Sequence, residues 1–204
     1  MSLTRFASAT PSATPRPQPG ERCDFCASPI GETHAHAVDV RDRRILCSCR
    51  PCYLLFAPSG AAQGRYKAIP ERYAYLADFS LDSAEWDALQ VPIGLAFFFY
   101  STPAQKTVAF YPSPAGATES LLSLSAWNGL LERYPDVAQM DADIEALLVD
   151  GRRDAERRAF IVPIDACYEL VGIVRTTWKG FDGGTEARER MDRFFSEVAA
   201  RARV

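Results

Sequence analysis

The sequence predicts an α+β protein: a small Cys-rich metal-binding module of zinc-ribbon or rubredoxin-like type, followed by a mixed α/β domain with a short sheet covered by helices. Five of the six cysteines lie between Cys23 and Cys52. Beyond them, short apolar runs typical of strands alternate with stretches of helical periodicity. The 204 residues are 48% hydrophobic, enough for one ordinary domain plus a small module. We therefore expect a disordered tail over residues 1–20, a metal module over 21–58 and the α/β domain over 65–204.

Four cysteines of the module form two pairs with the same spacing. Cys23 and Cys26 are separated by two residues, as are Cys49 and Cys52, where Pro51 fixes one φ angle. If each pair lies on a tight turn, both of its thiolates point the same way, and two pairs can surround one ion tetrahedrally. These four residues are the predicted metal ligands.

A disulfide framework is the competing interpretation of these cysteines. Residues 1–20 are polar and rich in proline, alanine, serine and threonine, and contain no apolar stretch of the kind found in secretory signals. An oxidising compartment therefore has no support, and we expect a cytoplasmic protein whose cysteines bind metal.

The remaining sulfur and the two histidines leave the ligand set open. Cys47 ends a strand-like run and shares a face with Cys49, so it could replace Cys49 or lie beside the site as a buried thiol. His34 and His36 share one face of the next strand-like segment, and could ligate, hydrogen bond to a thiolate, or be solvated. Seven potential ligands could also serve two ions if one sulfur bridged them.

The sulfur ligands suit zinc, and they equally suit a single iron of rubredoxin type. Zinc would hold together a module too small to build its own core. Iron would instead make the module an electron carrier. The cysteine spacing matches neither common ferredoxin pattern, and an all-sulfur site lacks the open position of a catalytic zinc.

Charge and hydropathy restrict the partners. The formal net charge is -3, and the one basic cluster, residues 41–44, is interrupted by an acid, so we expect no nucleic-acid partner. The longest apolar run, residues 91–100, is too short for a membrane span. Neither a nucleic acid nor a membrane span is therefore expected.

The α/β domain is predicted element by element. Asp82 or Ser83 caps a short helix that ends before Pro92, and two dense apolar runs then predict a hairpin. A polar, turn-rich loop follows, from Ser113 to Ser120. The strands are expected at 93–100, 107–111 and 160–162, and the later helices at 125–134, 140–148, 166–178, with Asp165 as cap, and 185–201.

No catalytic set stands out in the α/β domain. Both histidines lie in the module, so no Ser-His-Asp or Cys-His set exists unless the module folds over the domain. Asp165 and Glu169 could form a carboxylate pair on one helix face near Cys167 and Tyr168, but a helix cap plus a solvated acid is the simpler interpretation. The Ser113–Ser120 loop could line a pocket, although a structural turn explains it better.

Several strings carry a resemblance to a known family. They are residues 22–26, 34–36, 46–56, 92–99, 111–122 and 162–172. The chain resembles an uncharacterised bacterial family whose genes tend to sit in [NiFe]-hydrogenase clusters of high-GC bacteria. The resemblance implies an accessory protein that acts in assembly, in electron transfer, or as a bound hydrogenase subunit.

Three functional hypotheses follow. The first is an accessory protein of a hydrogenase-type system, with a structural zinc at the four paired cysteines and the α/β domain as the partner-binding surface. The alternative is a rubredoxin-like iron protein that transfers electrons to or from a hydrogenase. A third is an enzyme using the Ser113–Ser120 loop with Asp165 and Glu169.

Overall fold

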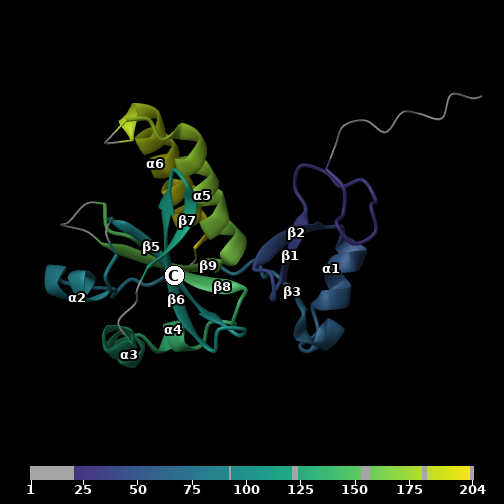
Figure 1. The fold of residues 1–204 in the computed structure, drawn as a ribbon, viewed down its shortest axis with the longest axis horizontal. Helices are drawn as coiled ribbons and strands as arrows, with labels where there is room; N and C mark the ends of the chain where they lie inside the picture. Colours follow the sequence, from purple (N-terminus) through teal and green to yellow (C-terminus); the bar gives the residue numbers. More distant parts are fainter. Residues whose placement is uncertain (1–20, 92, 121–123, 153–156, 181–182, 203–204) are drawn as a thin grey trace, which may run out of the picture.

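Two sheets organise the chain. The computed structural model describes residues 21–91, 93–120, 124–152, 157–180 and 183–202, so the predicted disordered tail lies outside the described residues. The first sheet has the order β2-β1-β3, formed by β1 (Ala35–Asp39), β2 (Arg44–Ser48) and β3 (Tyr66–Ala68). Helix α1 (Arg50–Phe56) and the short 3-10 helix η1 (Ala61–Gly64) lie between β2 and β3 in the chain. Figure 1 shows this part as a separate lobe.

The second sheet has six antiparallel strands in the order β4-β9-β8-β5-β6-β7. Its strands are β4 (Ala74–Tyr75), β5 (Leu95–Ser101), β6 (Lys106–Ser113), β7 (Gly116–Ser120), β8 (Glu145–Asp150) and β9 (Arg158–Pro163). The helices that accompany it are α2 (Ser83–Ala88), α3 (Leu124–Arg133), α4 (Pro135–Ala138), α5 (Ile164–Thr177) and α6 (Gly184–Arg201).

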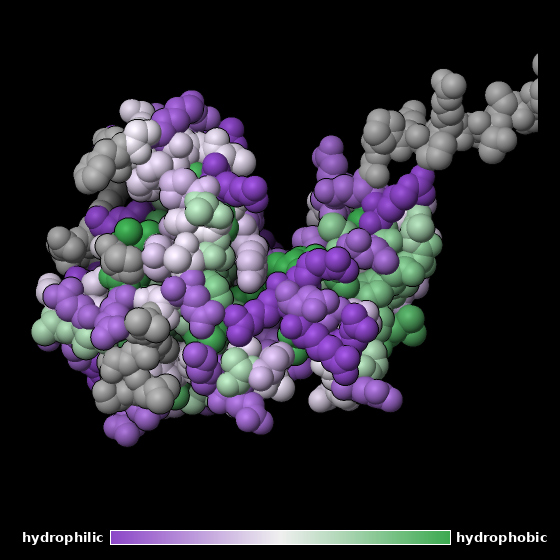
Figure 2. Space-filling model, viewed as in Figure 1, coloured by the Kyte–Doolittle hydropathy of each residue, from purple (hydrophilic) through white to green (hydrophobic). Residues whose placement is uncertain are grey.

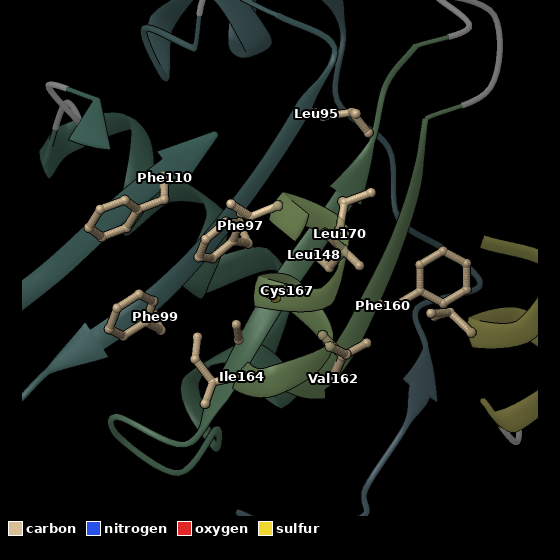
Figure 3. Close-up of a cluster of buried hydrophobic side chains, with 14 of the residues drawn as sticks. Leu95, Phe97, Phe99, Phe110, Leu148, Phe160, Val162, Ile164, Cys167 and Leu170 are labelled. Atoms are coloured by element: carbon tan, nitrogen blue, oxygen red, sulfur yellow. The ribbon is translucent and has the colours of Figure 1, made fainter. Parts of the chain in front are cut away.

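Helices cover both faces of this second sheet. Side chains alternate along each strand, so Phe97 and Phe99 pack toward α5 and α6, whereas Phe98 packs toward α3. Figure 1 shows α5 and α6 on one side of the sheet and α2, α3 and α4 on the other, and Figure 3 shows the first of these two cores. Burial on both faces explains why the central strands are almost continuously apolar.

The structure confirms the predicted α+β class and several of its elements. Asp82 is the N-cap of the short helix α2. Its carboxylate accepts a hydrogen bond from the Glu85 N–H, and the Glu85 carboxylate accepts one from the Asp82 N–H, which together form a capping box. The predicted hairpin is β5 and β6, the predicted third strand is β9, and the last helix buries its predicted core residues, Met191, Phe194, Phe195 and Val198.

Three of the local predictions were wrong. Residues 140–148 are not helical, because Ala146–Val149 is a short apolar run buried on both faces of the sheet as part of β8. Such runs do not distinguish a helix from a strand by periodicity alone. The expected loop from Ser113 to Ser120 contains a whole strand, β7. Helix α5 begins two residues earlier than predicted, so Asp165 lies in its first turn and Pro163 is the cap.

The two sheets are packed together. Val38, Val40 and Ile69 from the first sheet belong to the same buried cluster as α5 and the second sheet. Lys67 Nζ donates to Asp143 Oδ2 at 2.7 Å across the same junction. Residues 66–68, which the sequence places in the second domain, form the third strand of the first sheet. The proposed boundary between module and α/β domain would then fall after Ile69.

Asp150 forms ion pairs with Arg152 and Arg158 at one end of the second sheet, and these pairs lead to a pH-dependent prediction. Burial alone would raise the pKa of Asp150, but hydrogen bonds from Arg152 and Arg158 outweigh it, and the pKa lies below its ordinary value. A lowered pKa stabilises the fold above the unfolded-state pKa of about 3.9, and the stabilisation disappears as the pH falls through the folded value. We therefore expect Asp150→Asn to cost about 2 kcal/mol at pH 7 and less at pH 3, where the unfolded-state carboxyl is mostly protonated.

Urea unfolding followed by the fluorescence of the buried Trp86 and Trp127 measures this difference. Asp192→Asn is the matched control, because the Asp192 side chain is 52% exposed and contacts the same Arg152. A stability difference between wild type and Asp150→Asn that is the same at both pH values would contradict the prediction.

Candidate metal centre

The first cysteine pair lies on a tight turn that precedes the first sheet. The Ala27 N–H donates to the Cys23 carbonyl at 2.8 Å, and Ala27 has a positive φ of 59°, which closes the turn. Asp24 fixes this turn to β2, because its N–H donates to the Cys47 carbonyl and its carboxylate accepts from the Cys47 N–H at 2.7 Å. The sulfurs of the first pair are thereby held near the end of β2.

The second pair occupies the start of a helix and not a second hairpin turn. Cys49 is the N-cap of α1 and Cys52 lies in its first turn, with Pro51 at a position where its missing N–H costs nothing. The β1–β2 hairpin connects the two pairs. The local structure around the second pair therefore differs from the expected turn.

The fold brings the four paired cysteines together. The sulfurs of Cys23, Cys26, Cys49 and Cys52 all lie within 4.8 Å of one another, and no two of the protein's cysteines are joined as a disulfide. The Cys26 and Cys49 sulfurs are 3.6 Å apart. A tetrahedral site with metal–sulfur bonds of about 2.3 Å needs sulfurs about 3.8 Å apart. The tetrad could therefore hold one metal ion.

The surroundings of the four cysteines shift their thiol pKa values in different directions. Burial alone would raise the pKa of Cys23, but the N–H groups of Cys49, Cys26 and Phe25 outweigh it and lower that pKa to about 6. Burial, together with hydrogen bonds to the neighbouring thiols, raises the pKa of Cys52 to about 12. A bound cation would favour the thiolate form of all four cysteines, because metal binding displaces the thiol protons.

The comparison with protein families covers nearly the whole of this structure. A family model described as a family of unknown function, DUF5947, matches residues 22–202. The chain belongs to the DUF5947 family. No curated protein and no solved structure matches it. The match includes the Cys tetrad, both sheets and α6, so this DUF5947 chain carries its candidate metal centre within the family region.

Cys47 and the two histidines lie together, separate from the tetrad. Their ligand atoms also fall within 4.8 Å of one another. His36 additionally hydrogen bonds through Nδ1 to Asp165 Oδ2 of α5 at 2.8 Å. The Cys-rich module of this DUF5947 chain therefore folds against the second sheet. This contact is the condition under which the sequence allows a histidine to act together with residues of the α/β domain.

A cleft of about 580 Å³ borders these histidines at the junction of the two sheets, and Figure 2 shows the surface hollowed between the two lobes. Asp165 and Glu169, the predicted carboxylate pair, both line it. Burial, Glu197 and Asp165 raise the pKa of Glu169. Sequence reasoning missed Tyr73 and Arg201, whose guanidinium carbon lies 3.9 Å from the Tyr73 ring centroid. They are 128 positions apart in the chain, so no local pattern could have joined them.

Other residues that the sequence singled out lie elsewhere. Cys167 is a residue of α5 and is fully buried in the core, and the neighbouring Tyr168 packs against Phe97. Burial raises the pKa of the Cys167 thiol. The described lining of the cleft includes no residue from 113–120, which form the β6–β7 hairpin. The helices that the structure describes include none long and apolar enough to cross a membrane.

Proposed function

We propose that the protein is a metal-binding accessory protein whose Cys23, Cys26, Cys49 and Cys52 bind one structural zinc ion. The observation that carries this proposal is the convergence of four sulfurs from two separate segments to within 4.8 Å. Four thiolates complete a tetrahedral coordination shell, which suits a structural ion better than a catalytic one.

The composition of the first sheet supports a structural role for the ion. Beside the ligands, its buried apolar side chains are few and small, with Ala37, Val38, Leu46 and Ala68 among them. Such a small core is marginal without an additional cross-link. A zinc ion would connect the turn at Cys23 to the start of α1 and so fix both ends of the hairpin.

Iron is the second candidate, and one observation favours it. Cys26 is exposed at the surface, so an ion in the tetrad would lie close to a docked redox partner. A rubredoxin-like protein would use such a sulfur to pass an electron to or from a hydrogenase. The same four ligands serve both ions, so the metal itself has to be identified.

The accessory role rests on the resemblance to proteins encoded beside [NiFe]-hydrogenases. We propose that the protein acts in the cytoplasm with a protein partner. Leu54 and Leu55 support this role, because they are 52% and 66% exposed on α1 and a partner could cover them. The neighbouring Phe56, in contrast, packs against Phe25 and Tyr66.

Metal analysis of protein purified from its native host, without added metal, tests the proposal. We expect zinc in the tetrad and a colourless protein, with hydrogenase subunits or maturation factors co-purifying with wild type but not with Leu54→Glu/Leu55→Glu. Iron with thiolate absorption that bleaches on reduction would replace the first candidate by the second. A protein free of metal in both the native and the reconstituted state would contradict both candidates.

A further inference from the structure

Three potential ligands remain outside the tetrad and are brought together by strand register. His36 on β1 pairs directly with Cys47 on β2. His34 precedes His36 by two positions and projects from the same face of the extended chain. Directly opposed residues in an antiparallel pair have Cβ atoms about 5 Å apart, close enough for both side chains to share one ion.

His34 presents a buried lone pair without a partner. Its Nδ1 lies 2.9 Å from the Gly31 carbonyl, which can only accept, so Nδ1 carries the proton and Nε2 the lone pair. The side chain is 8% exposed, and Nε2 has no hydrogen-bond partner among the residues that the structure describes. Buried nitrogen acceptors are almost always satisfied, so this atom points to a missing ligand.

His36 is oriented in the same way by a different element. Asp165 Oδ2 lies 2.8 Å from His36 Nδ1, and a carboxylate accepts, so the His36 lone pair is also on Nε2. A carboxylate behind a histidine is the usual arrangement that fixes a metal-binding imidazole. The two rings lie edge to face, with centroids 4.8 Å apart.

We propose that His34, His36 and Cys47 bind a second divalent transition-metal ion of zinc type, independent of the tetrad. Two imidazole nitrogens and one thiolate are ligands that zinc prefers, and binding releases the Cys47 thiol proton to solvent. No bridging sulfur is needed, because the two sets share no residue. A cysteine nucleophile with a histidine base would need only one of the two imidazoles, and would leave His34 Nε2 unsatisfied.

This second ion would have an open coordination position, unlike the ion of the tetrad. Three protein ligands leave the fourth site to water or an external donor, which is the pattern of catalytic zinc. Both histidines line the cleft between the two sheets, together with Asp165, Glu169 and Tyr73.

Metal titration of the full-length protein tests the proposal. After removal of metal by a chelator, wild type reconstituted with Zn²⁺ should hold two ions per chain by mass spectrometry. Cys47→Ser, His34→Gln and His36→Gln should each keep one ion, that of the tetrad, whereas Cys49→Ser should lose the tetrad ion and, with the first sheet unfolded, the second ion as well. With Co²⁺, the variants at His34, His36 and Cys47, the triad, should lose one set of visible absorption bands and keep the set that arises from the four-sulfur site.

Two further measurements separate metal binding from other roles. Asp165→Ala should lower the affinity for the second ion by about 10- to 100-fold in chelator competition, and should leave the affinity of the tetrad unchanged. In wild type whose tetrad is already filled by one equivalent of Zn²⁺, a second equivalent should protect Cys47 from alkylation. A single ion in wild type that every triad variant retains would overturn the second site, as would rapid Cys47 alkylation that Zn²⁺ does not slow. Loss of metal only in Cys49→Ser would leave the tetrad proposal standing alone.

Discussion

Cys49→Ser is expected to remove the ion of the tetrad and to unfold the first sheet. Structural zinc supplies folding free energy on the order of 10 kcal/mol in small modules, far more than the few buried side chains of this sheet replace. Serine is a good N-cap residue, so the start of α1 is not weakened by the substitution itself. Metal analysis with limited proteolysis should show loss of the tetrad ion and new cleavage within residues 21–69.

Cys47→Ser is the matched control, since it removes a neighbouring thiol that does not belong to the tetrad. It should keep the tetrad ion and the protease resistance of the first sheet. The six-stranded sheet should stay resistant in both variants, because its two cores are formed mainly by its own helices. A Cys49→Ser protein that keeps all its metal and all its resistance would refute the structural role.

Phe97→Ala should be the most destabilising substitution in the second sheet. The Phe97 side chain is completely buried at the centre of β5 and packs against Phe99, Phe110 and Tyr168, with ring centroids 5.7 to 6.4 Å apart. Truncation of a buried phenylalanine removes its transfer free energy and leaves a cavity, at a cost of about 3–5 kcal/mol. Figure 3 shows Phe97 between Phe110 and Leu148 in this core.

Chemical denaturation measures this cost, and Tyr100→Ala on the same strand is its control. Tyr100 is 45% exposed, so its loss should change stability by well under 1 kcal/mol. If Phe97→Ala does not fold, Phe97→Leu should still lose about 1–2 kcal/mol. Equal stability of Phe97→Ala and Tyr100→Ala would show that the aromatic cluster does not hold the sheet together.

Features with a local cause were predictable from the sequence. The spacing of the cysteine pairs, the capping pattern around Asp82 and the helical spacing of Met191 and Phe195 each depend on residues a few positions apart. Their physical requirements are met within one turn, so neighbouring residues determine them. Strand β8 was mistaken for a helix because its apolar run is buried on two faces, and only the neighbouring strands show that.

The arrangement of the candidate sites depends on contacts between distant segments. The sequence by itself determined the α+β class and the four paired cysteines, because both follow from short-range patterns of apolar residues and thiols. Only the tertiary structure decided that Cys47 lies with His34 and His36, that Asp165 orients His36 across 129 positions, and that a cleft borders the histidines. Strand register and the packing of the first sheet on α5 produce these contacts, and no local pattern encodes either of them.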